Sequence, residues 1–182
     1  MTQSFRLRPA GLAALATLFA VGGFCLLLGI VLWTSRSVHP PVMSLAALST
    51  VATAALFIWF AVAQRHSSVA IEDNQLRIGI PLYGRTIPLD RVVPGSVRNL
   101  SLRGDDSYRL TWRTNGLGVP GYQLGWFRAQ GAGNGGADKV LAAITGDDVL
   151  AFRTKDDYAV ILSVTDGAGL ERAMRAALPA DP

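Results

Sequence analysis

A glycine-rich stretch in the second half of the chain, RTNGLGVPGYQLGWF (residues 113–127), decides how the fold is interpreted. Between Gly116 and Gly121 it matches G-x-G-x-x-G, the spacing of a dinucleotide-binding loop. Such a loop needs a parallel strand before it and a long helix after it. Here Pro120 stands where the helix should begin, and strand-like alternation resumes after Tyr122. The stretch is therefore interpreted as a wide glycine-rich connection between two strands, because glycine permits positive φ and close backbone approach.

Short apolar segments separated by turn residues lie on both sides of this stretch. Upstream, VAIEDNQLRIGI predicts a hairpin that turns at Asp73 and Asn74, and YRLTWRT predicts a strand with Tyr108, Leu110 and Trp112 on one face. Downstream, DKVLAAIT, DVLAFRT and YAVILSV are separated by the turn sequences GDD and KDD. The pattern indicates about seven short strands.

The end of the chain changes to a helical period. Asp166 is a suitable N-cap, Glu171 can pair with Arg175, and Pro179 ends the segment. Apolar residues recur at helical spacing at Leu170, Ala173, Met174, Ala177 and Leu178. We expect a helix over about residues 166–178. Seven strands followed by one amphipathic helix predict a bent β-barrel or sandwich whose open end the helix covers.

Two long uncharged runs precede the strands. Neither residues 9–35 nor residues 40–64 contain Asp, Glu, Lys or Arg, and about 20 apolar residues suffice to cross the hydrocarbon of a bilayer. The first run is too long for the roughly 7–15-residue core of a cleaved signal peptide. The sequence thus predicts transmembrane spans at about residues 10–33 and 42–63, a hairpin region over 1–65 and a β domain over 66–182.

The connection TSRSVHPPV is short, so the spans are expected to form an antiparallel hairpin with both ends on one side of the membrane. Arg6, Arg8 and Arg65 flank the spans on that side, and the positive-inside bias places them in the cytoplasm. Small residues would let the two helices approach closely. These are Ala16, Ala20, Gly22, Gly23 and Gly29 on the first span, with Ser44, Ala47, Ser49, Thr53 and Ala54 on the second.

Composition argues against several functions. The pI is about 9.7, but all 13 acidic residues lie beyond Gln64 together with 14 of the 17 basic ones, so the domain is nearly neutral and nucleic-acid binding is not expected. His39 and His66 are the only histidines, too few for a catalytic triad or a histidine-rich metal site. The paired aspartates at 105–106, 147–148 and 156–157 are assigned to turns. We expect no enzyme activity, no cofactor and no metal.

The order of these segments resembles the bacterial pleckstrin-homology-like (PH-like) domain family of small membrane proteins. The resemblance rests on two apolar spans followed by YGRTIPLDRV, TNGLGVPGYQLGWFR, VLAFRTKDDYAVILSV and a short final helix. It covers most of residues 68–178 and implies a seven-stranded, strongly bent barrel capped by a helix. The segment AQGAGNGGADK departs from the family pattern and is interpreted as an inserted hairpin loop.

The resemblance implies a membrane-anchored binding or scaffolding module in the bacterial plasma membrane. Specific inositide recognition is not expected, because the first hairpin offers only Arg77, with Arg85 after the next turn and the acidic Glu72 and Asp73 close by. A protein partner or a lipid head group is expected at the glycine-rich stretch, through backbone N–H groups and one guanidinium. The candidate residues are Arg113, Thr114, Asn115, Gly116, Gly118, Pro120, Gly121, Tyr122 and Trp126.

A second function stays open at this point. The chain would then be an accessory or regulatory subunit of a transporter or envelope enzyme, and the transmembrane hairpin would make the main contact. The sequence leaves the oligomeric state and the identity of any partner open.

Overall fold

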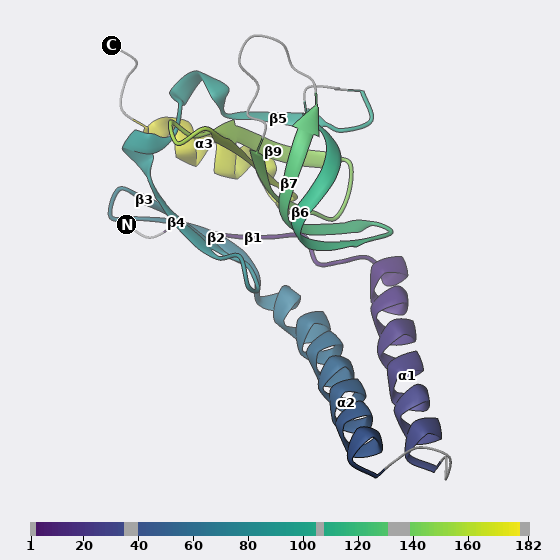
Figure 1. Ribbon diagram of the computed structural model, residues 1–182. Coiled ribbons are helices and arrows are strands. Elements are labelled where there is room, and N and C mark those ends of the chain that lie inside the picture. The colour runs from purple at the N-terminus through teal and green to yellow at the C-terminus, as the bar shows by residue number, and fades with distance from the viewer. Residues whose placement is uncertain (1–2, 35–39, 105–107, 131–138, 179–182) are drawn as a thin grey trace.

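The computed structural model describes residues 3–34, 40–104, 108–130 and 139–178, in which two long helices extend from a mainly-β domain (Figure 1). Helix α1 spans Leu12–Thr34 and helix α2 spans Pro40–Ala63. Two prolines begin α2, where a missing N–H costs no helical hydrogen bond. The expected order of two apolar helices, a mainly-β domain and a C-terminal helix is confirmed.

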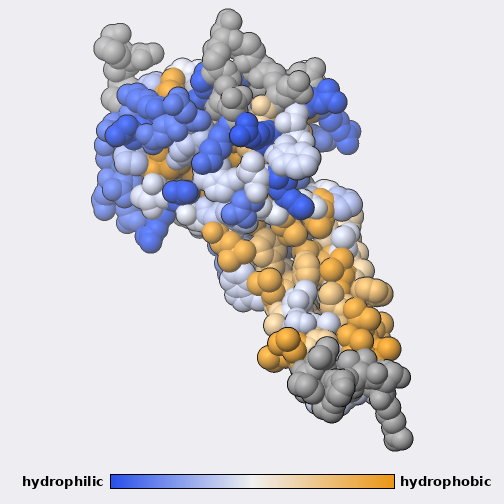
Figure 2. All heavy atoms as spheres, viewed as in Figure 1, coloured by the Kyte–Doolittle hydropathy of each residue, from blue (hydrophilic) through white to orange (hydrophobic). Residues whose placement is uncertain are grey.

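Both helices are long and apolar enough to cross a membrane, by their length and composition. They differ from the core helices of a soluble protein, because only 17% of each apolar window is buried within the chain. Figure 2 shows apolar side chains covering the two helices, whereas hydrophilic residues cover most of the domain. An apolar surface of this extent is not stable in water, so lipid is its natural surrounding.

Small residues bring α1 and α2 together at two levels. A Cβ on Gly29 would overlap Oγ1 of Thr50 and lie 3.2 Å from its Cβ, and a Cβ on Gly22 would lie 3.6 Å from Cβ of Phe57. Ala54 is buried on the facing side of α2. The other small residues of α1 in the prediction, Ala16, Ala20 and Gly23, are exposed, because they lie off the helix face that Ala14, Leu18, Gly22 and Gly29 share. Ser49 is exposed as well, and the side chain of Ser44 lies outside the described residues.

The domain consists of two sheets. The first has the order β1-β2-β3-β4 and is antiparallel throughout. The second has the order β5-β9-β10-β8-β7-β6 and is antiparallel except between β8 and β10. The strands are β1 Gln3–Arg6, β2 Ser68–Glu72, β3 Gln75–Gly79, β4 Arg85–Pro88, β5 Arg98–Ser101, β6 Arg109–Val119, β7 Tyr122–Gln130, β8 Lys139–Ile144, β9 Asp148–Arg153 and β10 Tyr158–Leu162.

The first strand corrects the domain boundary drawn from the sequence. Arg6 pairs with Ser68 in the β1–β2 ladder, so the helical hairpin is inserted between two neighbouring strands of one sheet. The next residues join the second sheet, because Leu7 forms a bridge with Val164 and the Arg8 N–H donates to the carbonyl of Ser163 at 2.8 Å. The residues before the first span thus belong to the β domain, and they connect its two sheets.

Two apolar cores result from this arrangement. The larger core lies between the two sheets and includes Val69, Leu76, Phe152 and Leu162. The smaller core lies on the opposite face of the six-stranded sheet. There the Arg98 guanidinium on the edge strand β5 lies 5.7 Å from the ring centroid of Tyr108, which precedes the other edge strand. The sheet is therefore strongly curved, in agreement with the bent barrel that the resemblance implies.

The expected C-terminal helix is α3, Gly167–Ala177. The Asp166 side chain accepts a 2.8 Å hydrogen bond from the Gly169 N–H, and Arg175 pairs with Glu171 at 2.6 Å, as the sequence predicts. Leu170 and Met174 are buried in the larger core. The sequence missed the four-residue strands β1 and β5, whereas the β2–β3 turn has positive φ at Asp73 and Asn74, as a two-residue hairpin needs. The AQGAGNGGADK insertion falls mostly outside the described residues.

Candidate functional site

The glycine-rich stretch is a strand hairpin and not the wide connection that the sequence predicted. Strands β6 and β7 pair along almost their whole length and are joined by a turn at Pro120 and Gly121. Gly121 has φ +73° in this turn, but Gly116 lies inside the ladder, opposite Gly125. Most of the glycines therefore serve strand packing and do not form a loop.

Gly116 and Gly125 permit a close approach of the β6 and β7 backbones and of the Tyr83 side chain. A Cβ on Gly116 would overlap the carbonyl oxygen of Leu124. A Cβ on Gly125 would lie 2.5 Å from the Asn115 carbonyl oxygen and 3.1 Å from Cζ of Tyr83, and Gly125 has φ +115°. The Tyr83 hydroxyl donates to Oδ1 of Asn115 at 3.1 Å. The paired glycines thus make room for Tyr83 from the turn between β3 and β4.

Two irregularities in β6 reorient its first half. The register with β7 shifts at Thr111 and again at Thr114, and these hydroxyls donate to the carbonyls of Arg128 and Trp126 at 3.2 and 3.0 Å. Because each β-bulge adds one residue, side-chain alternation is interrupted. Trp112 is 71% exposed as a result, although Tyr108 is buried, so the prediction of a single apolar face is wrong.

Trp126 lies in an aromatic and cationic cluster. The Lys139 ammonium lies 4.5 Å and the Arg85 guanidinium 5.4 Å from its ring centroid, and Tyr158 meets it edge-on at 5.4 Å. Burial, followed by the charge of Asp156, raises the pKa of Tyr158, which keeps its hydroxyl protonated at neutral pH. Trp126 therefore has a packing role beside two cations.

The tip of the hairpin packs against the helices. The Tyr122 ring meets Phe60 of α2 edge-on at a centroid separation of 6.2 Å, and Leu117 and Val119 pack against the larger core. Burial raises the pKa of Tyr122, so this phenol stays neutral. The glycine-rich tip thus lies at the helix ends, on the membrane side of the domain.

The nine candidate residues do not form one surface. Arg113, Thr114 and Asn115 are exposed on β6, whereas Tyr122 is buried and Trp126 is half-buried. Gly116 and Gly118 lie within the β6 strand, while Pro120 and Gly121 form the turn. The part of the prediction that remains available to a partner is the exposed first half of β6.

The aspartate pairs assigned to turns lie near arginines. Asp147 pairs with Arg103 at 2.7 Å, and Asp148 lies 3.8 Å from Arg8. Asp156 pairs with Arg91 at 3.3 Å. The pair at residues 105–106 falls outside the described residues. Within the described ranges, no three His, Cys, Asp or Glu side chains gather in a way that suits a metal ion.

Gln64, which the sequence reasoning did not single out, joins the two helices to the domain. Its side chain is 3% exposed, and its Oε1 accepts a 2.7 Å hydrogen bond from the Ala10 N–H, just before α1. Its Nε2 donates to the Ala61 carbonyl at 3.3 Å. The only signal in the sequence is that Gln64 carries an amide side chain at the end of an uncharged run. Polar residues at the membrane–water interface often stand in the same place, so the signal does not distinguish the two roles.

Leucine in place of Gln64 is expected to lower the free energy of unfolding by about 1–3 kcal/mol, because the buried Ala10 N–H loses its acceptor. Thermal unfolding of the full chain in detergent checks this. Gln75→Leu, on an exposed position of β3, serves as the control and should leave the midpoint unchanged. Equal midpoints for the two variants would contradict the assigned role of Gln64.

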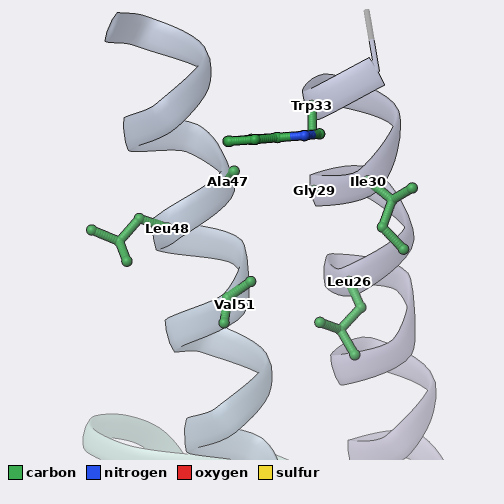
Figure 3. Close-up of a pocket in the computed structure, with 7 residues that line it drawn as sticks. All are labelled: Leu26, Gly29, Ile30, Trp33, Ala47, Leu48 and Val51. Atoms are coloured by element: carbon green, nitrogen blue, oxygen red, sulfur yellow. The ribbon is translucent and has the colours of Figure 1, made fainter.

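The helices carry a groove near the ends that lie away from the domain. It has a volume of about 430 Å³ and is lined by Leu26, Gly29, Ile30, Trp33, Ala47, Leu48 and Val51. Figure 3 shows the Trp33 ring extending from α1 toward Ala47 of α2. The lining is almost wholly apolar, as expected for a surface in contact with lipid tails or another helix.

The domain has the features of a PH-like fold, namely two mainly antiparallel sheets and a C-terminal helix that caps them. Together with the two apolar helices, these features define a PH-like membrane protein. The chain belongs to the bacterial PH domain family. The model of this family matches residues 67–177, which are more than half of the chain. The matched region begins directly after the two helices. Strand β1, which precedes the helices in the chain, therefore lies outside the match but pairs with β2 inside it. No curated protein and no solved structure matches the chain.

Proposed function

We propose that this protein is a membrane-anchored, non-catalytic module whose PH-like domain binds a protein partner through the first half of β6. The observation that carries the proposal is Trp112, which is 71% exposed on a strand that also carries the exposed Arg109 and Arg113. Tryptophan and arginine are enriched among the residues that dominate binding energy at protein interfaces. The membership in the bacterial PH domain family supports a binding or scaffolding role.

The chemistry of this edge favours recognition by side chains. Strand β6 is the edge of its sheet, but its two bulges interrupt the regular spacing that an added strand would need. Neither Arg109 nor Arg113 forms an ion pair with another described residue. We therefore expect a partner that supplies an apolar contact to Trp112 and carboxylates to the two arginines.

The location that we propose is the cytoplasmic face of a bacterial plasma membrane. Arg6 and Arg8 precede α1 and Arg65 follows α2, which is the positive charge expected at cytoplasmic helix ends. A reporter enzyme that is active only in the cytoplasm, fused to the C-terminus, tests this location. Activity of the reporter is expected, and an inactive reporter would contradict the cytoplasmic location.

Replacing Trp112 and Arg113 together by serine is expected to reduce partner recovery at least about tenfold, because interface tryptophan and arginine each contribute more than 1 kcal/mol when they dominate binding. Co-purification from crosslinked membranes measures the recovery. Both side chains are exposed, so the unfolding midpoint should not change. Arg77→Ser, at an exposed position on β3, is the matched control. Undiminished recovery with the double variant, or loss of lipid crosslinks instead of protein crosslinks, would contradict a protein partner at β6.

The groove between the helices favours the second function, an accessory subunit that acts through its hairpin. Its volume of about 430 Å³ and apolar lining suit the side chains of a third helix. Val51→Trp would fill this groove. Loss of a complex with this variant, together with intact complexes in the β6 variants, would support the accessory role over the β6 module.

A further inference from the structure

A recess lies where the helix ends meet the β domain, away from the exposed half of β6. Its volume is about 560 Å³, and its walls include Arg6, Pro9, Leu15, Gln64 and Arg65. These residues come from the segment before α1, from α1 itself and from the end of α2. The recess therefore opens at the level where a bilayer surface would meet the domain.

The backbone on both sides of the recess is well anchored. Arg6 is the last residue of β1, where it pairs with Ser68, and its carbonyl accepts a 3.0 Å hydrogen bond from the Thr165 N–H. Arg65 lies in the short 3-10 helix Gln64–His66 that follows α2. The two cationic side chains thus project from fixed backbone positions, Arg6 just before the first span and Arg65 just after the second.

Within the described part of the chain, no carboxylate pairs with either of the two guanidinium groups. Both side chains are exposed, and neither guanidinium makes an ion pair or hydrogen bond with a described residue. Arg8, by contrast, lies 3.8 Å from Asp148. Gln64 is also occupied, because its amide oxygen binds the Ala10 N–H. The cationic hydrogen-bond donors of the recess that remain available therefore come from Arg6 and Arg65.

The other wall of the recess is apolar. Leu15 lies on α1, inside the run that suits lipid, and Pro9 contributes a side chain without a donor. The recess thus combines two arginines on the side of the domain with an apolar surface on the side of the helices. A phospholipid has the same order of groups, with an anionic phosphate at the surface and an acyl chain below it. Arginine suits this ligand, because its planar fork binds two phosphate oxygens at once.

We propose that this recess binds the head group of an anionic phospholipid of the surrounding bilayer, with Arg6 and Arg65 as its phosphate ligands. Basic pockets beside transmembrane helices recognise such lipids by charge and hydrogen bonding. The site is separate from β6, so it does not depend on the proposed partner. It would fix the depth and tilt of the domain at the membrane surface.

Lipid retention by the full chain tests the site. The protein is reconstituted into nanodiscs of equal phosphatidylglycerol and phosphatidylcholine, extracted in mild detergent, and the ratio of co-purifying lipids is measured by mass spectrometry. Each basic residue at an anionic surface contributes about a fivefold preference, so R6Q/R65Q is expected to lower the ratio about 5- to 30-fold. The variant R77Q/R128Q removes the same charge from two exposed positions elsewhere and should retain the wild-type ratio.

Three results would overturn the proposal. These are an unchanged lipid ratio in R6Q/R65Q, an equal loss in R77Q/R128Q, and complete displacement of phosphatidylglycerol by millimolar inorganic phosphate, which would indicate a site for a free anion. Unfolding midpoints equal to wild type for R6Q/R65Q would show that the lost lipid does not reflect a lost fold. R6K/R65K, which keeps the charge without the planar fork, is expected to give an intermediate ratio.

Discussion

Alanine in place of Gly125 is expected to prevent stable folding of the β domain. The residue has φ +115°, a conformation that side-chain-bearing residues rarely adopt, and an added Cβ would lie 2.6 Å from Cα of Gly116 and 2.5 Å from the Asn115 carbonyl oxygen. These neighbours are backbone atoms, which cannot move aside as a flexible side chain does. We expect a loss of about 4 kcal/mol or more from a typical stability of about 5–15 kcal/mol.

Thermal unfolding of the full chain, followed by tryptophan fluorescence in detergent, measures this effect, and gel filtration reports the folded fraction. Gly118→Ala is the matched control within the same motif, because its Cβ would meet only Nη1 of Arg113, at 3.8 Å. We expect that variant to remain within about 1 kcal/mol of wild type. A tolerated alanine at Gly125, or equal damage at the two positions, would contradict the packing role assigned to the Gly116–Gly125 pair.

Local signals in the sequence were sufficient for much of the fold. The uncharged runs, the turn at Asp73 and Asn74, and the capped periodic segment after Asp166 each depend on residues close together in the chain. The corresponding elements α1, α2, the β2–β3 hairpin and α3 all form. Elements of this kind are predictable because their stabilising contacts lie within a few residues.

The missed elements depend on contacts between distant parts of the chain. The strand at Gln3–Arg6 is only four residues long, and its partner β2 follows after both helices. Likewise, glycine in a sequence shows only that a tight conformation is allowed. At Gly125 that conformation serves a close approach, to the Asn115–Gly116 backbone of the neighbouring strand and to Tyr83 from the turn between β3 and β4.

The candidate site was predicted less well than the fold, for a related reason. A β-bulge has no strong local signature, so the alternation in YRLTWRT placed Trp112 on the same face as the buried Tyr108. The bulges turned Trp112 outward and made it the main exposed aromatic side chain among the described residues of the domain. Trp112, the contact residue that we propose, thus directly precedes the glycine-rich stretch.

The hairpin carries the second large expected effect, at Gly29. Leucine at this position would place its Cβ against Oγ1 of Thr50, whose hydroxyl already donates to carbonyls of the preceding turn of α2. Overpacking of a close contact costs about 1–3 kcal/mol, and the Cβ meets Thr50 even where the rest of the leucine side chain extends into the adjoining groove. We expect α1 and α2 to separate by about 2 Å, toward the 8–10 Å interaxial distance of ordinary helix pairs. Spin labels at Thr34 and Leu45, in a Cys25→Ser background, measure this separation in nanodiscs.

Gly23→Leu provides a control of equal hydrophobicity in the same helix. A Cβ on Gly23 meets nothing within 4 Å and points toward the surroundings of the hairpin, so the label separation should stay at the wild-type value. If Gly29→Leu also kept that value, the close contact at Thr50 would not set the helix spacing. If both variants increased the label separation, the cause would be the introduction of a leucine anywhere in α1 and not the contact with Thr50. Only separation confined to Gly29→Leu agrees with a hairpin held together by its small-residue face, because lipid tails give two apolar helices no hydrophobic reason to associate.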